Sequence, residues 1–104
     1  MQFVVVAEHS PESCPTSNKQ IRDLMREVSQ QIPDLTKKLG VEIITFRVLG
    51  PDHQFIAIVE AADIEAVRDF LMQSRMVQWN TTTVRATWSL DEALAKAEPL
   101  PTLV

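Results

Sequence analysis

Four short runs rich in β-branched and aromatic residues, separated by two longer segments, limit most strongly what this chain can fold into. Each run is long enough for one strand and too short for a typical helix. The runs are QFVVVAEH (2–9), VEIITFRVL (41–49), QFIAIVE (54–60) and TTTVRATW (81–88). The turn residues GPDH (50–53) make the second and third strands a hairpin.

The two longer segments have the apolar spacing of amphipathic helices. The first places Ile21, Leu24, Met25, Val28, Ile32, Leu35 and Leu39 on one face. We expect Thr16 or Ser17 to cap its beginning, Gly40 to end it, and Pro33 to kink or restart it near Ile32. The second begins at Asp63, with Ile64, Val67, Phe70 and Leu71 inward. A capping box at Ser89–Glu92 starts a short last helix, followed by the apolar tail EPLPTLV.

The order β-α-β-β-α-β predicts an α+β, ferredoxin-like fold in one domain, residues 1–104. Right-handed crossovers then give a four-stranded antiparallel sheet of order 4-1-3-2, with both long helices on one face. The opposite face also carries apolar residues, among them Val4, Val6, Ile56 and Ile58. Such a face is a liability on a monomer, so we expect a homodimer that packs sheet against sheet, with the apolar tail reaching the partner.

Composition excludes several classes of protein. A net charge of −4 and a pI near 5.0 disfavour nucleic-acid binding, which needs a basic face. No apolar run approaches the roughly 18 residues of a membrane span, and MQFVVVAEHS lacks the marks of a signal peptide. A single cysteine, Cys14, fits a reducing compartment, so we expect a cytoplasmic protein.

The element order and the apolar patterning resemble the dimeric α+β barrel superfamily of ferredoxin-like proteins. The segments FVVVAEHSPESCPTSN and ATWSLDEAL are similar to those of small, uncharacterised members. That superfamily includes antibiotic-biosynthesis-type and haem-degrading monooxygenases, muconolactone isomerase-like proteins and ligand-binding domains of regulators. The resemblance implies a homodimer that binds a small, largely apolar organic ligand. It carries over no catalytic residue, because the superfamily shares topology rather than a motif.

The predicted topology brings five chemically distinctive residues to one end of the sheet. His9 follows the first strand, His53 precedes the third, and Trp79 and Asn80 precede the fourth. Cys14 comes shortly before the first helix. Because neighbouring strands are antiparallel, all of these positions lie at the same end of the sheet. Asn18 lies at the start of the helix, where backbone N–H groups favour an anionic ligand group or simply a cap.

Three interpretations of the residues at this end of the sheet remain open. In a cofactor-independent monooxygenase or isomerase, His9 is the base, Cys14 takes part as a thiolate, and Asn18, His53, Trp79 and Asn80 contact the ligand. No Asn or Asp is obviously placed to orient His9, which argues against a hydrolytic Cys–His pair. In a metal- or haem-binding protein, His9, Cys14 and His53 are the ligands. The third interpretation is a non-catalytic ligand-sensing or assembly module.

Overall fold

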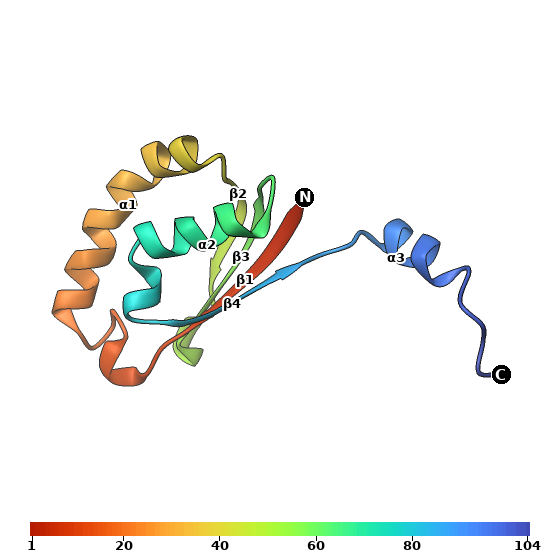
Figure 1. Ribbon diagram of the computed structural model, residues 1–104. Coiled ribbons are helices and arrows are strands. Elements are labelled where there is room, and N and C mark those ends of the chain that lie inside the picture. The colour runs from red at the N-terminus through yellow and green to blue at the C-terminus, as the bar shows by residue number, and fades with distance from the viewer.

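One antiparallel sheet with two helices on a single face forms the body of the molecule in a computed structural model that describes residues 1–104 (Figure 1). The strands β1 (Gln2–Glu8), β2 (Glu42–Val48), β3 (Gln54–Glu60) and β4 (Thr81–Ala86) lie in the order β2-β3-β1-β4. Helices α1 (Lys19–Leu39) and α2 (Ile64–Gln73) cover one face, and α3 (Leu90–Ala97) follows β4. The predicted α+β fold and the 4-1-3-2 order, numbered from the other edge, are confirmed.

Three of the strands are shorter than the sequence predicts. The β1–β4 ladder runs from Phe3 opposite Ala86 to Glu8 opposite Thr81. β1 begins at Gln2, so after Ala86 only Thr87 still forms a backbone hydrogen bond with it. Trp88 therefore lies outside the sheet. At the other end β1 stops at Glu8, and His9 stands just past the strand with its backbone N–H donating to the His53 carbonyl, N···O 3.1 Å.

The beginning of α1 differs from the predicted cap. Asn18, rather than Thr16 or Ser17, is the cap: its Oδ1 accepts the N–H of Ile21 at 3.1 Å. Ser17 and Asn18 instead donate their backbone N–H groups to the Cys14 carbonyl, which closes a turn. The hydroxyl of Thr16 points to the Cys14 sulfur. The residues before Asn18 therefore belong to the preceding loop.

Pro33 lies inside α1 without restarting it. The helix is continuous from Lys19 to Leu39 and ends at Gly40, whose φ of 67° is the left-handed conformation expected of a C-cap glycine. A proline has no N–H to donate to the carbonyl four residues earlier. Figure 1 shows α1 as a curved helix that arches over the sheet.

The dense core lies between the sheet and α2. The most completely buried side chains are Phe3 and Val59 from the sheet and Val67 from α2. The apolar stripe of α1 is only half-buried, and no α1 residue is fully buried. None of the helices combines the length and apolar character that crossing a membrane requires.

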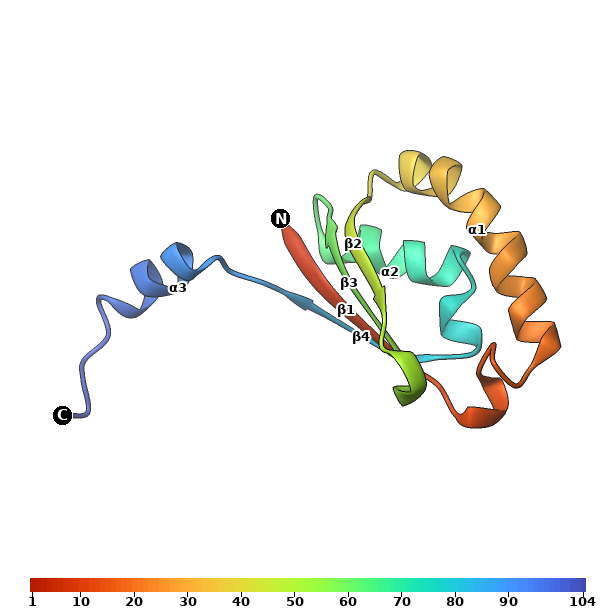
Figure 2. The same cartoon turned by 180° about the vertical axis from the view of Figure 1, so that it is seen from behind.

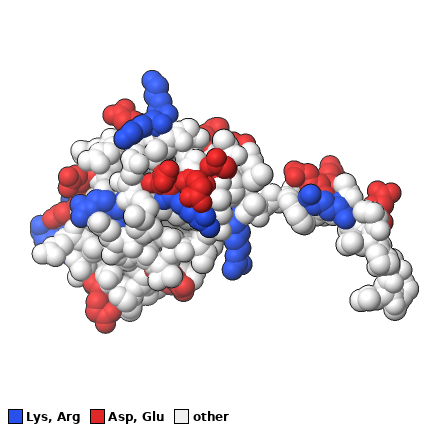
Figure 3. Space-filling model, viewed as in Figure 1, with Lys and Arg blue, Asp and Glu red and all other residues white.

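The chain after β4 forms an arm that leaves the body (Figures 1 and 2). The predicted capping box is present, since Ser89 accepts the N–H of Glu92 and the Glu92 side chain accepts the N–H of Ser89. α3 buries no residue, and Figure 3 shows it standing clear of the globular part. The arm exposes Trp88, Leu90, Leu94, Leu100, Leu103 and Val104.

Candidate metal centre beside an apolar cavity

Two histidines and the single cysteine meet at the end of the sheet where β1 ends and β3 begins. One ligand atom from each of His9, Cys14 and His53 lies within 4.8 Å of the other two. The β1–β3 pairing places the two histidines side by side, and the turn before α1 brings Cys14 over them. Asn80 and Trp79 join them just before β4. The predicted gathering of these residues is confirmed.

Asn80 fixes the orientation and the tautomer of His9. The Nδ2 group of Asn80 donates to the carbonyl and to the sulfur of Met76, both at 3.2 Å. Its Oδ1 therefore faces His9 Nδ1, at 2.9 Å, and an amide oxygen can only accept. His9 thus carries its proton on Nδ1, and the lone pair of Nε2 points into the cluster. Nε2 is buried and has no hydrogen-bond partner.

His53 presents a second free nitrogen to the same place. Its Nδ1 is buried and also lacks a hydrogen-bond partner. The residue closes the β2–β3 hairpin with φ 58° and ψ 39°, a left-handed conformation that is uncommon for a residue with a side chain. Strained backbone of this kind persists where the surroundings hold it. Here the backbone bond from His9 holds the hairpin end against β1.

Cys14 reaches the cluster from a loop that is held by several hydrogen bonds. The side chain of Asn18 donates to the carbonyl of Glu12 at 3.0 Å. The guanidinium group of Arg22, on the first turn of α1, donates to the carbonyls of Pro15 and Thr16. Cys14 itself is only 5% exposed. The loop therefore holds the sulfur in place before any ligand arrives.

The surroundings of Cys14 favour the thiolate. The hydroxyl of Thr16 donates to the sulfur at 3.0 Å, and this bond is the main cause that lowers the pKa of Cys14 to about 6. The backbone N–H of Thr16 lowers this pKa as well, and burial opposes the shift. The nearby His9 and His53 rings lower it further to a smaller extent, although neither ring nitrogen reaches the sulfur with hydrogen-bond geometry. At neutral pH the sulfur is mostly ionised, which is the form that binds metals and attacks electrophiles.

Two aromatic side chains separate this cluster from the interior of the protein. The ring of His9 packs 5.2 Å from the rings of both Phe55 and Trp79, measured between centroids. His9 continues the side of β1 that carries Phe3, Val5 and Ala7, and all three are buried beneath the helices. The histidine therefore faces the helix layer, and not the open face of the sheet.

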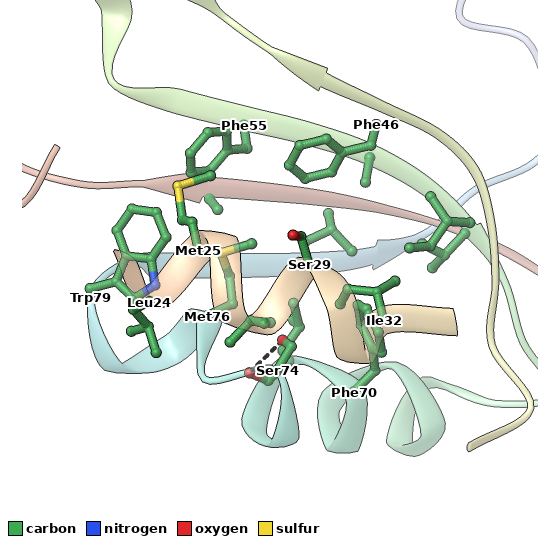
Figure 4. A pocket seen from close by; sticks show the side chains of 17 residues that line it. Leu24, Met25, Ser29, Ile32, Phe46, Phe55, Phe70, Ser74, Met76 and Trp79 are labelled. Atoms are coloured by element: carbon green, nitrogen blue, oxygen red, sulfur yellow. Dashed lines mark hydrogen bonds between the residues drawn. The ribbon is translucent and has the colours of Figure 1, made fainter. Parts of the chain in front are cut away.

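An apolar cavity of about 350 Å³ begins behind these aromatic rings, between the sheet and the two helices (Figure 4). Figure 4 shows Trp79, Met25 and Phe55 at one end of the cavity and Ile32 and Phe70 toward the other. Only two of its 17 lining residues, Ser29 and Ser74, are polar. Their hydroxyls already donate to the carbonyls of Arg26 and Leu71. The cavity thus offers almost no polar anchor to a ligand.

The predicted site residues separate into three groups. His9, Cys14 and His53 form the cluster, and Asn80 orients His9; the expectation that no Asn or Asp orients His9 was therefore wrong. Trp79 lines the cavity, and its predicted contact with a ligand stays a prediction. Asn18 contributes to neither site, because both polar ends of its side chain are used by its own loop and helix.

Sequence reasoning missed the two residues that condition the cluster most directly. Thr16 was expected to cap α1 but polarises the thiol. Phe55, expected only as a strand residue, forms the wall beneath His9. The position of Phe55, two residues after His53 in the third strand, was the available signal.

No protein-family model matches this chain, and no curated protein matches it significantly.

Proposed function

We propose that this protein binds a transition-metal ion through Nε2 of His9, Nδ1 of His53 and Sγ of Cys14. The observation that carries the proposal is the pair of buried, unpartnered imidazole nitrogens that share one small space with the thiol of Cys14. A buried polar atom without a partner costs about 1–3 kcal/mol. A metal ion bound between the three atoms would satisfy both nitrogens and the thiolate together.

The arrangement around His9 is typical of a metal ligand. Metal-binding histidines usually donate their other ring N–H to a protein oxygen, which fixes the ring and raises the basicity of the ligating nitrogen. Asn80 supplies that oxygen. A single ion suits this geometry better than haem, because all three donors converge on one point, whereas haem iron takes its protein ligands along one axis.

A catalytic cysteine is the main competitor, since Cys14, His9 and Asn80 lie in the order of a nucleophile, base and orienting group. Two observations favour the metal. The sulfur is nearly inaccessible to a substrate, at 5% exposure. A Cys–His pair would also leave Nδ1 of His53 buried and unused.

The first test is elemental analysis and an absorption spectrum of untagged protein as purified, followed by metal titration of the metal-free chain. We expect about one ion per chain in the wild type and loss of binding in Cys14→Ser and His53→Gln. Ser13→Ala is the matched control, because Ser13 adjoins Cys14 and its hydroxyl forms a hydrogen bond with Ser10 rather than with the cluster. Failure of every transition ion to bind would refute the proposal.

A second function is favoured by the cavity: we infer that it binds a small, largely apolar organic molecule. Its volume is at the lower end of the range for ligand pockets, and its lining lacks free polar groups, so an aliphatic or aromatic hydrocarbon portion is the part it can hold. A cofactor-independent oxidation or isomerisation with His9 as base is the enzymatic form of this proposal. It requires a ligand atom to pass Trp79 and Phe55 and reach Nε2.

Replacing Val28, which lines the cavity, by Phe tests this second function. Binding of a fluorescent aliphatic probe, such as a dansylated fatty acid, should weaken about tenfold or more in Val28→Phe, because the new ring occupies the site. Glu27→Phe adds the same ring to an exposed position of α1 and should leave binding unchanged. Equal affinity in the two variants would show that the probe binds elsewhere.

We also propose that two copies associate through the open face of the sheet. Val4, Val6, Ile56 and Ile58 are half-buried there, although no helix covers them. Arg47 and Arg85 share this face and are exposed, as are Glu8 and, in part, Glu60. A two-fold pairing can set these opposite charges against each other. We expect sedimentation at twice the chain mass and a monomer in Ile58→Glu; a wild-type monomer at micromolar concentration would contradict the proposal.

A further inference from the structure

We propose that the centre formed by His9, Cys14 and His53 selects copper in the Cu(I) state and holds it as a three-coordinate ion. This inference rests on the proposed metal binding and names the ion. Three features of the described residues support it: the number of donors, the exclusion of water from them, and the charge of the filled site.

The His, Cys, Asp and Glu side chains supply three donors here and no fourth. The group of potential ligands contains no carboxylate. The Oδ1 atom of Asn80 is occupied by His9, and the hydroxyl of Thr16 donates to the sulfur itself. Structural zinc sites are almost always four-coordinate and tetrahedral. Cu(I) is stable with three ligands, and a soft thiolate donor suits it.

Water has little access to supply the missing fourth ligand. The two imidazole nitrogens have almost no exposed surface, and the whole of Cys14 is 5% exposed. Phe55 and Trp79 pack against His9 on the inner side. A catalytic zinc or an octahedral divalent ion would need one or more waters in this space. A trigonal ion needs none.

The charge of the filled site also favours a monovalent ion. The thiolate contributes one negative charge and the two imidazoles are neutral ligands, so Cu(I) gives an uncharged centre. Zn²⁺ or another divalent ion would leave a net positive charge beside aromatic rings, with no carboxylate in the cluster to balance it. A buried, uncompensated charge is strongly disfavoured.

The test compares Cu(I) and Zn²⁺ on the full-length, metal-free chain under anaerobic conditions. Cu(I) is supplied with ascorbate and a chromophoric Cu(I) chelator such as bicinchoninate, and Zn²⁺ with a chromophoric zinc chelator. We expect one Cu(I) per chain, bound at least about 100-fold more tightly than Zn²⁺. X-ray absorption at the copper edge should show one sulfur and two nitrogen neighbours.

The possible results distinguish the choice of Cu(I) from the more general proposal that the centre binds a metal ion. Zn²⁺ binding as tightly as Cu(I), or a copper ion with four ligands, would overturn the choice of ion while metal binding stands. No binding of either ion would overturn the choice of copper, and failure of every other transition ion as well would overturn both. Cys14→Ser should lose Cu(I) affinity by roughly 100-fold or more, while Ser13→Ala keeps it. Should Cys14→Ser not fold, His53→Gln on the hairpin carries the same test, and undiminished Cu(I) affinity in it would contradict the assignment.

Discussion

The two helices that cover the sheet differ in how they use it. α2 has ten residues and buries Val67, Phe70 and Leu71 against the strands. α1 has 21 residues and buries none of them completely. Part of its apolar stripe, at Leu24, Met25, Val28 and Ile32, lines the cavity, and α2 adds Phe70 and Leu71 to the same lining. The same sheet face therefore carries the buried core beneath α2 and the adjoining cavity, and residues such as Val59 belong to both.

In this small domain, close packing and the candidate sites are found beneath different helices. The interior beneath α2 carries the close packing that a small domain needs. α1 packs against this core only with half-buried residues such as Ile32, Leu35 and Leu39. Its beginning is fixed to the preceding loop by the Arg22 hydrogen bonds. The candidate metal centre lies at the beginning of α1. A metal ion bound there would stabilise the α1 half of the molecule, which is packed less closely than the α2 half.

Metal loading should change the α1 half most, and it is the largest effect we expect. At a free metal concentration 100 times Kd, binding to the folded state alone stabilises it by about 2.7 kcal/mol. Hydrogen exchange should slow around residues 9–18 and 53 and in the first turns of α1, with little change in α2. Protection spread evenly over both helices, or absent from 9–18, would contradict the assignment of the centre to this end of α1.

A matched pair of valine truncations tests the packing difference directly. Val67→Ala removes two methyl groups from a side chain with 0% exposure and should cost about 2 kcal/mol of the free energy of unfolding. Val28→Ala makes the same change beside the cavity and should cost less than about 1 kcal/mol, because little new packing is lost. Urea denaturation measures both. Equal losses would mean that α1 packs as closely as α2 in solution.

Element order, sheet topology and the meeting of His9, Cys14 and His53 follow from the sequence, because they depend on apolar periodicity and on the antiparallel rule. Both signals are repeated over many residues, so single exceptions do not change the outcome. The strand ends that bring His9 beside His53 are fixed by the hairpin GPDH and by the buried parity of β1.

The details that decide the chemistry depend on single side-chain contacts, which periodicity does not encode. Asn18 replaces Thr16 as the cap because residues 15–17 belong to a turn that begins at Cys14, whose carbonyl accepts the N–H groups of Ser17 and Asn18. The tautomer of His9 follows from the amide of Asn80, whose orientation is set in turn by Met76. The cavity arises because α1 arches away from the sheet, and no residue pattern distinguishes that from a packed helix.

Measuring the pKa of Cys14 tests the structure of the loop before α1. The expected effect is smaller than those above, but it depends on one hydrogen bond. Its pKa lies near 6 in the folded chain, below the ordinary thiol value of 9.0, chiefly because Thr16 donates to the sulfur. The thiolate therefore adds stability fully above about pH 9, where the unfolded thiol is ionised as well, and this contribution is lost as the pH falls through 6.

Thiolate absorbance at 240 nm of the metal-free protein should rise with a midpoint near pH 6. In Thr16→Val the midpoint should move up by about one pH unit, since a hydrogen bond to a charged group is worth at least about 1.4 kcal/mol. Ser17→Ala removes a neighbouring hydroxyl that makes no bond to the sulfur and serves as the control. A wild-type midpoint above 8 would show that the Thr16 bond does not form.

The arm, residues 88–104, belongs neither to the core nor to the helix layer. Its removal should have the smallest effect on the free energy of unfolding of the domain. α3 buries nothing, and the last bond between the arm and the sheet runs from Thr87 to Gln2. Ending the chain after Thr87 should change the unfolding free energy of a single body by less than about 0.5 kcal/mol. A loss of several kcal/mol that grows with protein concentration would instead mean that the exposed leucines of the arm pack on a second copy. The same truncation thus measures whether the apolar arm stabilises the assembly or leaves the single chain unchanged.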